Sequence, residues 1–179
     1  MPSEAPGVYA VARTPNPAAS AAGRAAIDAA AVQQLLDTRR ELLLDGQRPS
    51  LDSLCERLAS MWLSDEPVIY VGLAGTSLRT RVGQFHSTGL GARSPHAGGW
   101  PIKCISNLSA TWVHFGECTD VKVAERKMLD AFVSMVTPEA QGGVLDPELP
   151  LPYANLEVRD SAGRRRIKRH GIKGAKAPR

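Results

Sequence analysis

Several residue types are scarce in this chain of 179 residues, and each shortage excludes a class of protein. The three cysteines, Cys55, Cys104 and Cys118, form no C-x-x-C pair, which argues against a disulfide framework and against a zinc site. No apolar run approaches the roughly 18 residues that a membrane span needs. The first residues also lack the basic start and long apolar stretch of a signal peptide. We therefore expect a cytoplasmic protein with no membrane partner.

Positive charge, in contrast, is concentrated at the C-terminal end. Residues 159–179 hold nine of the 22 Lys and Arg residues but one of the 18 acids, which leaves 13 basic and 17 acidic residues elsewhere. A weakly acidic body with a strongly basic end indicates a polyanionic partner, most often nucleic acid. We expect a single domain over residues 1–160 and a basic, flexible tail over residues 161–179. The candidate nucleic-acid-binding residues there are Arg164, Arg165, Arg166, Lys168 and Arg169. A solvated tail without any partner is the alternative.

The first half of the chain predicts two strands separated by two helices. Residues 7–13 and 67–74 are short, apolar and rich in β-formers, as strands are. Between them, a linker rich in Pro, Ala and Ser precedes apolar residues at helical spacing from Ile27 to Leu43. A second helix is predicted from Ser50, its cap, to Met61. Their stripe of Leu and Val predicts a docking face more than a recognition element.

The second half predicts two more strands and two helices. Thr76 or Ser77 is available to cap a helix that presents Arg81. Residues 101–107 and 110–117 have the composition of strands, and Thr119 is a candidate cap for a helix that follows. The predicted fold is therefore α+β, with a small mixed or antiparallel sheet of at least four strands, flanked by helices.

One carboxylate falls on the apolar stripe of that last helix. Steps of four and three from Val121 place Glu125 on the same stripe as Met128, Phe132 and Met135. Because an unpaired buried carboxylate is costly, Glu125 should be paired with a cation, bound to a metal or set in a pocket.

A set of residues then follows in a recognisable order. It comprises Gly7-Val8-Tyr9, Tyr70-Val71-Gly72, Arg81 on the next helix, Glu125 on a later helix, and Asn155 after a Pro-Tyr turn. This order resembles the GIY-YIG nucleases, over residues 6–13 and 66–160. In that family the two tyrosine strands usually form a tight hairpin, whereas residues 14–65 separate them here, as a linker plus a helical insertion.

The resemblance implies a role for each of these five positions. Tyr9 would be the base, with Tyr70 orienting water and phosphate, and Arg81 would hold the scissile phosphate with its planar fork. Glu125 would hold Mg²⁺ or Mn²⁺, since such an ion keeps most of its waters and needs few protein ligands. Asn155 would help to hold the site together.

Three further residues are candidates for the site. His86 lies one residue after the position at which some restriction members of the family place a histidine. His96, in a glycine-rich loop, is a second candidate for phosphate contact. Arg79 is the alternative to Arg81 and a candidate nucleic-acid-binding residue.

The resemblance implies a metal-dependent endonuclease that hydrolyses phosphodiester bonds of nucleic acid, with DNA the expected substrate. Two other classes stay open. One is a catalytically idle nucleic-acid-binding protein on the same fold. The other is an interaction protein whose basic tail docks on an acidic partner without any site.

Overall fold

The computed structural model of the chain describes residues 1–19, 23–64, 66–96, 98–159, 166–168 and 170–174. The strands are β1 (Gly7–Ala12), β2 (Leu42–Leu44), β3 (Val68–Ala74), β4 (Trp112–Glu117), β5 (Glu157–Arg159), β6 (Arg166–Lys168) and β7 (Ile172–Gly174). The helices are α1 (Ala29–Thr38), α2 (Leu51–Ser60), α3 (Leu78–Ser87), α4 (Val121–Met135), α5 (Pro138–Gly142) and the 3₁₀ turns η1 (Trp100–Cys104) and η2 (Leu108–Ala110). The predicted α+β class is confirmed.

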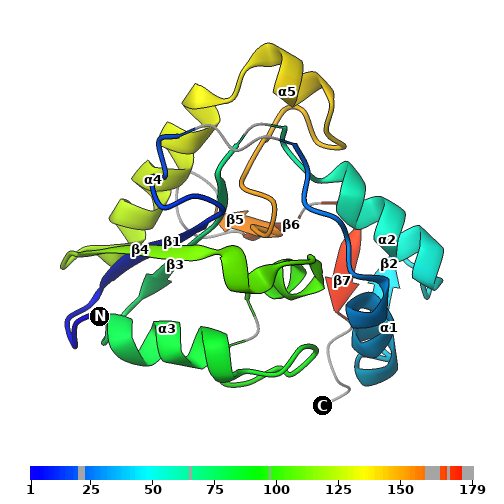
Figure 1. Cartoon of the computed structure of the whole chain (residues 1–179), viewed down its shortest axis with the longest axis horizontal. Coiled ribbons are helices and arrows are strands. Elements are labelled where there is room, and N and C mark those ends of the chain that lie inside the picture. The colour runs from blue at the N-terminus through cyan, green and yellow to red at the C-terminus, as the bar shows by residue number, and fades with distance from the viewer. Residues whose placement is uncertain (20–22, 65, 97, 160–165, 169, 175–179) are drawn as a thin grey trace.

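The main sheet has three antiparallel strands, with β1 between β3 and β4. In this register Tyr9 lies opposite Gly72 on one side and Phe115 on the other. Helices α3 and α4 lie on either side of the sheet (Figure 1). Both outer strands leave one edge without a strand partner among the described residues, and the edge of β3 is the one that matters for the site.

Alternation along β1 sends side chains to two different helices. Tyr9 packs with Leu78 and Val82 of α3, whereas Ala10 packs with Leu129 of α4. The predicted cap of α3 is confirmed, because the hydroxyl oxygen of Ser77 accepts a hydrogen bond from the Thr80 amide at 3.1 Å.

The cap and the buried stripe of α4 differ from the prediction. Asp120 rather than Thr119 accepts a hydrogen bond from the backbone of the first turn. The buried residues are Leu129 and Phe132, whereas Met135 is 67% exposed. The helix thus turns a slightly different face to the sheet than the spacing from its first apolar residue predicted.

The predicted strand over residues 101–107 is wrong. This segment forms η1, whose residues Trp100, Pro101, Ile102 and Cys104 are buried. Proline has no amide proton to give to a sheet and its fixed φ suits the first turn of a helix, so Pro101 favours the turn over a strand. The main sheet accordingly has three strands, one fewer than predicted.

The second helix of the insertion begins where it was predicted, whereas the first helix is shorter than predicted. Ser50 caps α2 as predicted, but α1 ends at Thr38 and the three leucines of β2 pair with β7. A helical period cannot reveal this pairing, because the partner strand lies about 130 residues away along the chain.

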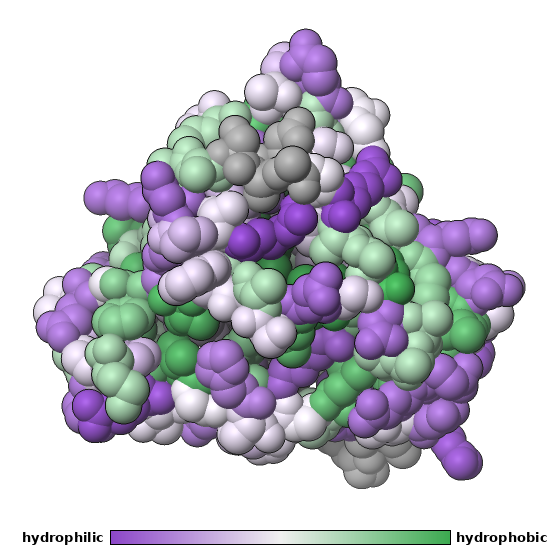
Figure 2. Space-filling view, in the orientation of Figure 1, coloured by the Kyte–Doolittle hydropathy of each residue, from purple (hydrophilic) through white to green (hydrophobic). Residues whose placement is uncertain are grey.

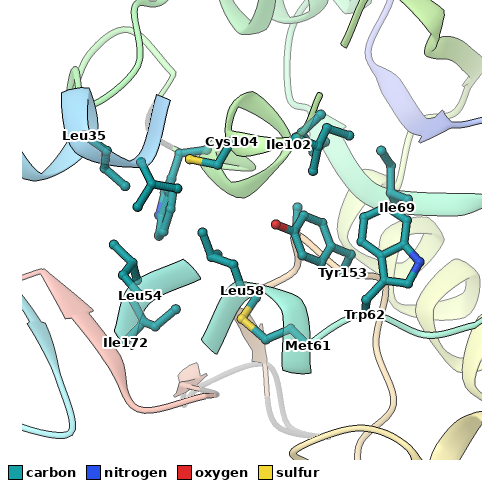
Figure 3. Packing of buried hydrophobic residues seen from close by; sticks show 14 of the residues in the cluster. Leu35, Leu54, Leu58, Met61, Trp62, Ile69, Ile102, Cys104, Tyr153 and Ile172 are labelled. Atoms are coloured by element: carbon teal, nitrogen blue, oxygen red, sulfur yellow. The ribbon is translucent and has the colours of Figure 1, made fainter. Parts of the chain in front are cut away.

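The leucine-rich faces of α1 and α2 form the main hydrophobic core rather than a docking surface. Leu35, Leu54 and Leu58 are fully buried. In Figure 3 they converge with side chains of η1 and of the segment that precedes β5. The ring centroids of Trp62 and Tyr153 lie 4.8 Å apart in this cluster. The docking-face interpretation is therefore wrong for these residues.

Two stretches of the basic C-terminal segment form strands. Strand β6 pairs with β5, and β7 pairs with β2. Between them, His170 is buried with Nδ1 3.0 Å from the Asp146 carboxylate, and Ile172 belongs to the main core. Residues 166–168 and 172–174 are therefore paired as strands, and Ile172 contributes to the core, where a flexible tail was predicted.

Hydrophilic and hydrophobic residues are interspersed on the face shown in Figure 2. Among the described residues, no helix is both long enough and apolar enough to cross a membrane.

Candidate active site

The edge of β3 borders a cavity of about 510 Å³. Tyr70 from β3, Arg81 from α3 and Glu125 from α4 line this cavity, together with Asn155 from the segment before β5. The two helices lie on opposite faces of the sheet, so side chains from both reach the same space around the open edge of the strand. The fold thus brings together four of the five residues that the resemblance singled out.

Tyr9, the fifth residue, lies behind Tyr70 rather than in the cavity wall. Its side chain is 1% exposed, and its ring centroid is 5.9 Å from that of Tyr70. Both rings lie over Gly72, where an added Cβ would come within 2.8 Å of the Tyr9 hydroxyl and 2.9 Å of the Tyr70 ring. A residue with any side chain at this position would push the two phenols apart.

The glycine-rich loop covers Tyr70 from the other side. A Cβ at Gly98 would lie 3.1 Å from the Tyr70 hydroxyl, and one at Gly99, whose φ is +67°, would lie 3.3 Å from the ring. Phe85 of α3 stacks on Tyr70 at a centroid distance of 6.2 Å and an interplanar angle of 9°. These contacts fix the orientation of the phenol that faces the cavity.

The two candidate histidines have different places. His96 is 3% exposed, and its Nε2 lies 2.8 Å from the Tyr9 hydroxyl oxygen. The Thr88 hydroxyl accepts a hydrogen bond from the His96 amide at 3.2 Å, which anchors the residue. His86 is exposed and is absent from the cavity wall. Of the two, the structure therefore brings His96 to the tyrosines.

Burial governs the ionisation of these rings. Desolvation, with a smaller contribution from the Arg81 charge, lowers the pKa of His96 to about 4, so its imidazole is neutral near neutral pH. Desolvation also raises the pKa of Tyr9 and raises that of Tyr70 to about 12. The charge of Arg81 favours both phenolates, as expected from the sequence, but burial outweighs it.

Hydrogen bonding distinguishes the two phenols. The hydrogen bond between them lowers the pKa of Tyr70 and raises that of Tyr9. This hydrogen bond therefore favours the phenolate of Tyr70 over that of Tyr9. Nε2 of the neutral His96 ring is hydrogen-bonded to the Tyr9 hydroxyl at 2.8 Å. Tyr9 thus contacts both His96 and Tyr70, the phenol that lines the cavity.

The two candidate arginines of α3 also differ. Arg79 is exposed and pairs with Glu4 at 2.9 Å, so it holds the N-terminal segment on α3. Arg81 lines the cavity and makes one long contact, 3.5 Å, with the Pro95 carbonyl oxygen. Its guanidinium is placed to take an anionic ligand.

Glu125 is half-buried in the cavity wall. Its negative charge raises the pKa of both Tyr9 and Tyr70, so the carboxylate acts on the phenols electrostatically. In the described part of the chain, no group of three or more His, Cys, Asp or Glu residues has the arrangement of a metal centre. One carboxylate beside an open cavity nevertheless fits Mg²⁺, which retains several waters and takes one or two carboxylates.

Asn155 extends the edge of β3. Its side-chain oxygen accepts a hydrogen bond from the Val71 amide at 2.9 Å, and its side-chain nitrogen donates to the Val71 carbonyl at 2.8 Å. Asn155 is 7% exposed, so the pair replaces the partner strand that β3 lacks on this side. It thereby fixes the backbone between Tyr70 and Gly72.

The structure describes two of the five predicted nucleic-acid-binding residues of the C-terminal segment. Arg166 and Lys168 belong to β6, whose backbone pairs with β5. Arg164, Arg165 and Arg169 lie outside the described residues.

One cavity residue was missed in the sequence. Arg39, at the C-terminal end of α1, lines the same cavity as Tyr70 and Arg81. No local signal distinguishes it from Arg40 beside it, because only the packing of the insertion against the sheet domain brings it to the cavity.

Comparison with known proteins gives no relative. No protein-family model, no curated protein and no solved structure matches the chain.

Proposed function

We propose that the protein is a divalent-metal-dependent endonuclease of the GIY-YIG type that hydrolyses phosphodiester bonds of nucleic acid, with DNA the expected substrate. The observation that carries the proposal is the convergence of Tyr70, Arg81 and Glu125, from β3, α3 and α4, on one cavity. A phenol, a guanidinium and a carboxylate supply the base, the phosphate clamp and the metal ligand that this hydrolysis requires.

Arg81 binds the scissile phosphate. Within the described residues its guanidinium makes a single long contact, with the Pro95 carbonyl, so it can offer two parallel N–H groups to two phosphate oxygens. Arg81, and with it the bound phosphate, lies near Tyr70, since the charge of Arg81 lowers the pKa of that phenol. The phosphate and the base are thereby held next to each other.

Tyr70 rather than Tyr9 takes the proton of the attacking water in this proposal, in contrast to the assignment that the resemblance implies. Tyr70 lines the cavity, whereas Tyr9 is enclosed. The hydrogen bond with Tyr9 favours the Tyr70 phenolate, and Tyr9 is held in turn by its 2.8 Å contact with His96. As the water oxygen bonds to phosphorus, its proton passes to the phenolate oxygen and the bond from phosphorus to the leaving oxygen breaks.

Mg²⁺ or Mn²⁺ held by Glu125 would neutralise the carboxylate that raises the pKa of Tyr70, and would stabilise charge on the leaving oxygen. Glu125 itself orients toward the cavity from α4, on the far side of the sheet edge from Arg81. Asn155 keeps the β3 backbone in place so that Tyr70 stays between these two charges.

The test is incubation of the purified protein with supercoiled plasmid and with structured RNA, with Mg²⁺, with Mn²⁺ and with chelator. We expect nicking that requires the metal, and we expect Glu125→Gln to lower the rate by about a hundredfold or more without loss of fold. Glu139→Gln, at an exposed carboxylate of α5, is the matched control and should cut like the parent.

The outcome separates the competing classes. Salt-dependent binding without cleavage by the parent would identify an idle nucleic-acid-binding protein. If the parent neither binds nor cleaves nucleic acid, the interaction-protein class remains. If the parent and Glu125→Gln cut equally fast, Glu125 is not part of the active site.

A further inference from the structure

A second arginine faces the cavity from the helical insertion. Arg39 follows the last turn of α1, and its side chain is 14% exposed. It lines the cavity in company with Leu42 of β2 and Ile172 of β7, whereas Arg81 and Glu125 come from the helices on the sheet. The insertion and the C-terminal strand thus build a wall of the cavity in addition to the hydrophobic core.

The guanidinium of Arg39 is anchored through one nitrogen. Its Nε donates to the Gly91 carbonyl at 3.0 Å. The nearest carboxylate, Glu41, is 4.0 Å from the same Nε and pairs more closely, at 2.6 Å, with Arg93. Within the described residues, neither terminal nitrogen of Arg39 contacts a protein acceptor. The two amino groups that form the fork therefore remain for a ligand.

The charges around Arg39 also favour an anionic ligand. Burial lowers the pKa of Arg39, the nearby Arg93 lowers it further, and Glu41 compensates only in part. A half-buried cation with incomplete compensation costs folding free energy, and an anion in the cavity would offset that cost. Its planar fork suits two oxygens of a phosphate.

We propose that Arg39 binds a second phosphate of the same nucleic acid strand, next to the one that Arg81 holds. This inference rests on the proposed function for the identity of the ligand. The cavity volume of about 510 Å³ lies within the range of whole-ligand sites, about 300–1,000 Å³, so it exceeds what a single phosphate requires. The substrate is therefore a polynucleotide strand with at least two phosphates in the cavity, and the insertion is the element that selects it.

The first experiment measures binding alone. A fluorescein-labelled single-stranded DNA is titrated, in chelator and across a salt series, with the parent, Arg39→Gln and Arg40→Gln. We expect Arg39→Gln to lose about tenfold or more in affinity and about 0.7 in the slope of log affinity against log salt. Arg40, the exposed neighbour with no place in the cavity wall, is the matched control and should change little.

The second experiment locates the phosphate. Neutral methylphosphonate linkages are placed one at a time along the same DNA, and the affinity of each probe is measured. The parent should lose affinity at two neighbouring positions, and Arg39→Gln should have lost its sensitivity at one of them. If Arg39→Gln does not fold, Arg39→Lys provides the second test: it keeps the charge without the fork, so it should lose affinity while it keeps the salt slope.

Each outcome bears on the inference. Parent-like affinity and salt slope for Arg39→Gln, or unchanged sensitivity at both positions, would overturn it. Binding that depends on Arg39 without any cleavage by the parent would overturn the nuclease proposal and leave this inference standing. No DNA binding by the parent would overturn both.

Discussion

The hydroxyl oxygen of Tyr9 lies 2.8 Å from Nε2 of His96, and both side chains are almost completely enclosed. This contact joins a loop residue to the central strand, 87 positions apart in the sequence. It matters because burial keeps the imidazole neutral and so makes it a hydrogen-bonding partner of a phenol rather than a charge.

Acid should therefore destabilise the protein through His96. Its pKa is lowered from 6.5 to about 4, so the unfolded chain binds more protons between these values, and stability falls as pH falls from about 6.5 to about 4. The loss is at most about 3 kcal/mol. Urea unfolding across this range should show a shallower pH dependence for His96→Gln than for the parent. The exposed His86→Gln should keep the parent's slope; equal slopes for all three proteins would refute the expectation.

The geometry of Arg81 predicts that its charge alone is insufficient. Arg81→Lys retains a positive charge but loses the two parallel donors, so single-turnover cleavage should fall by about tenfold or more. Arg79→Lys is the control, since Arg79 pairs with Glu4 on the exposed side of the helix. Near-normal cleavage by the Arg81 variant together with loss in the Arg79 variant would move the phosphate site to Arg79.

Gly72 should tolerate no side chain. In Gly72→Ala the new Cβ would lie 2.8 Å from the Tyr9 hydroxyl, so the rings must separate, at a cost of about 1–3 kcal/mol. Gly75→Ala, with no atom within 4 Å of its added Cβ, is the matched control. The measurement is the free energy of unfolding together with the cleavage rate, and both should drop in the first variant only. A parent-like Gly72→Ala protein would mean that the tyrosine pair is not tightly packed.

The sequence predicted the parts of the structure that depend on nearby residues. The strands that carry Tyr9 and Tyr70 are short apolar runs, and the caps Ser50 and Ser77 are recognised within one helical turn. The order of the site residues along the chain also sufficed to single out four that share a cavity.

Features that depend on distant partners were missed or mispredicted. Leu42–Leu44 fit a helical period, yet they pair with a strand near the C-terminus. The basic composition of that end suggested a tail, although Ile172 fills the core. Arg39 and the contact of His96 with Tyr9 likewise exist only because the folded chain brings separate segments together.

Asn155 provides a test of how the edge of β3 is held. Asn155→Ala leaves the amide and carbonyl of Val71 without these partners and should cost about 1–3 kcal/mol. Asn155→Asp keeps the acceptor but sets a carboxylate against the Val71 carbonyl, so it should be worse near neutral pH. Its deficit should shrink as pH falls, because a protonated carboxyl can donate.

The control for this pair is Asn16→Ala. The exposed side chain of Asn16 bonds within its own turn, so its removal should change the free energy of unfolding by no more than about 0.5 kcal/mol. An Asp variant whose deficit is independent of pH would argue against the donor role of the Asn155 amide.

The last prediction concerns the C-terminal strand. Ile172 is 7% exposed and packs in the main core, while its neighbour Lys173 is exposed on the same strand. Ile172→Ala should therefore lower the free energy of unfolding by about 2–5 kcal/mol. Lys173→Ala should change it by no more than about 0.5 kcal/mol. Equilibrium urea unfolding of both variants measures the difference, with an unchanged denaturant slope showing that the native state stays compact. Equal, small effects of the two substitutions would indicate that this segment is a dispensable tail. Truncation of a residue that contributes nothing to the core leaves no cavity and therefore costs little stability.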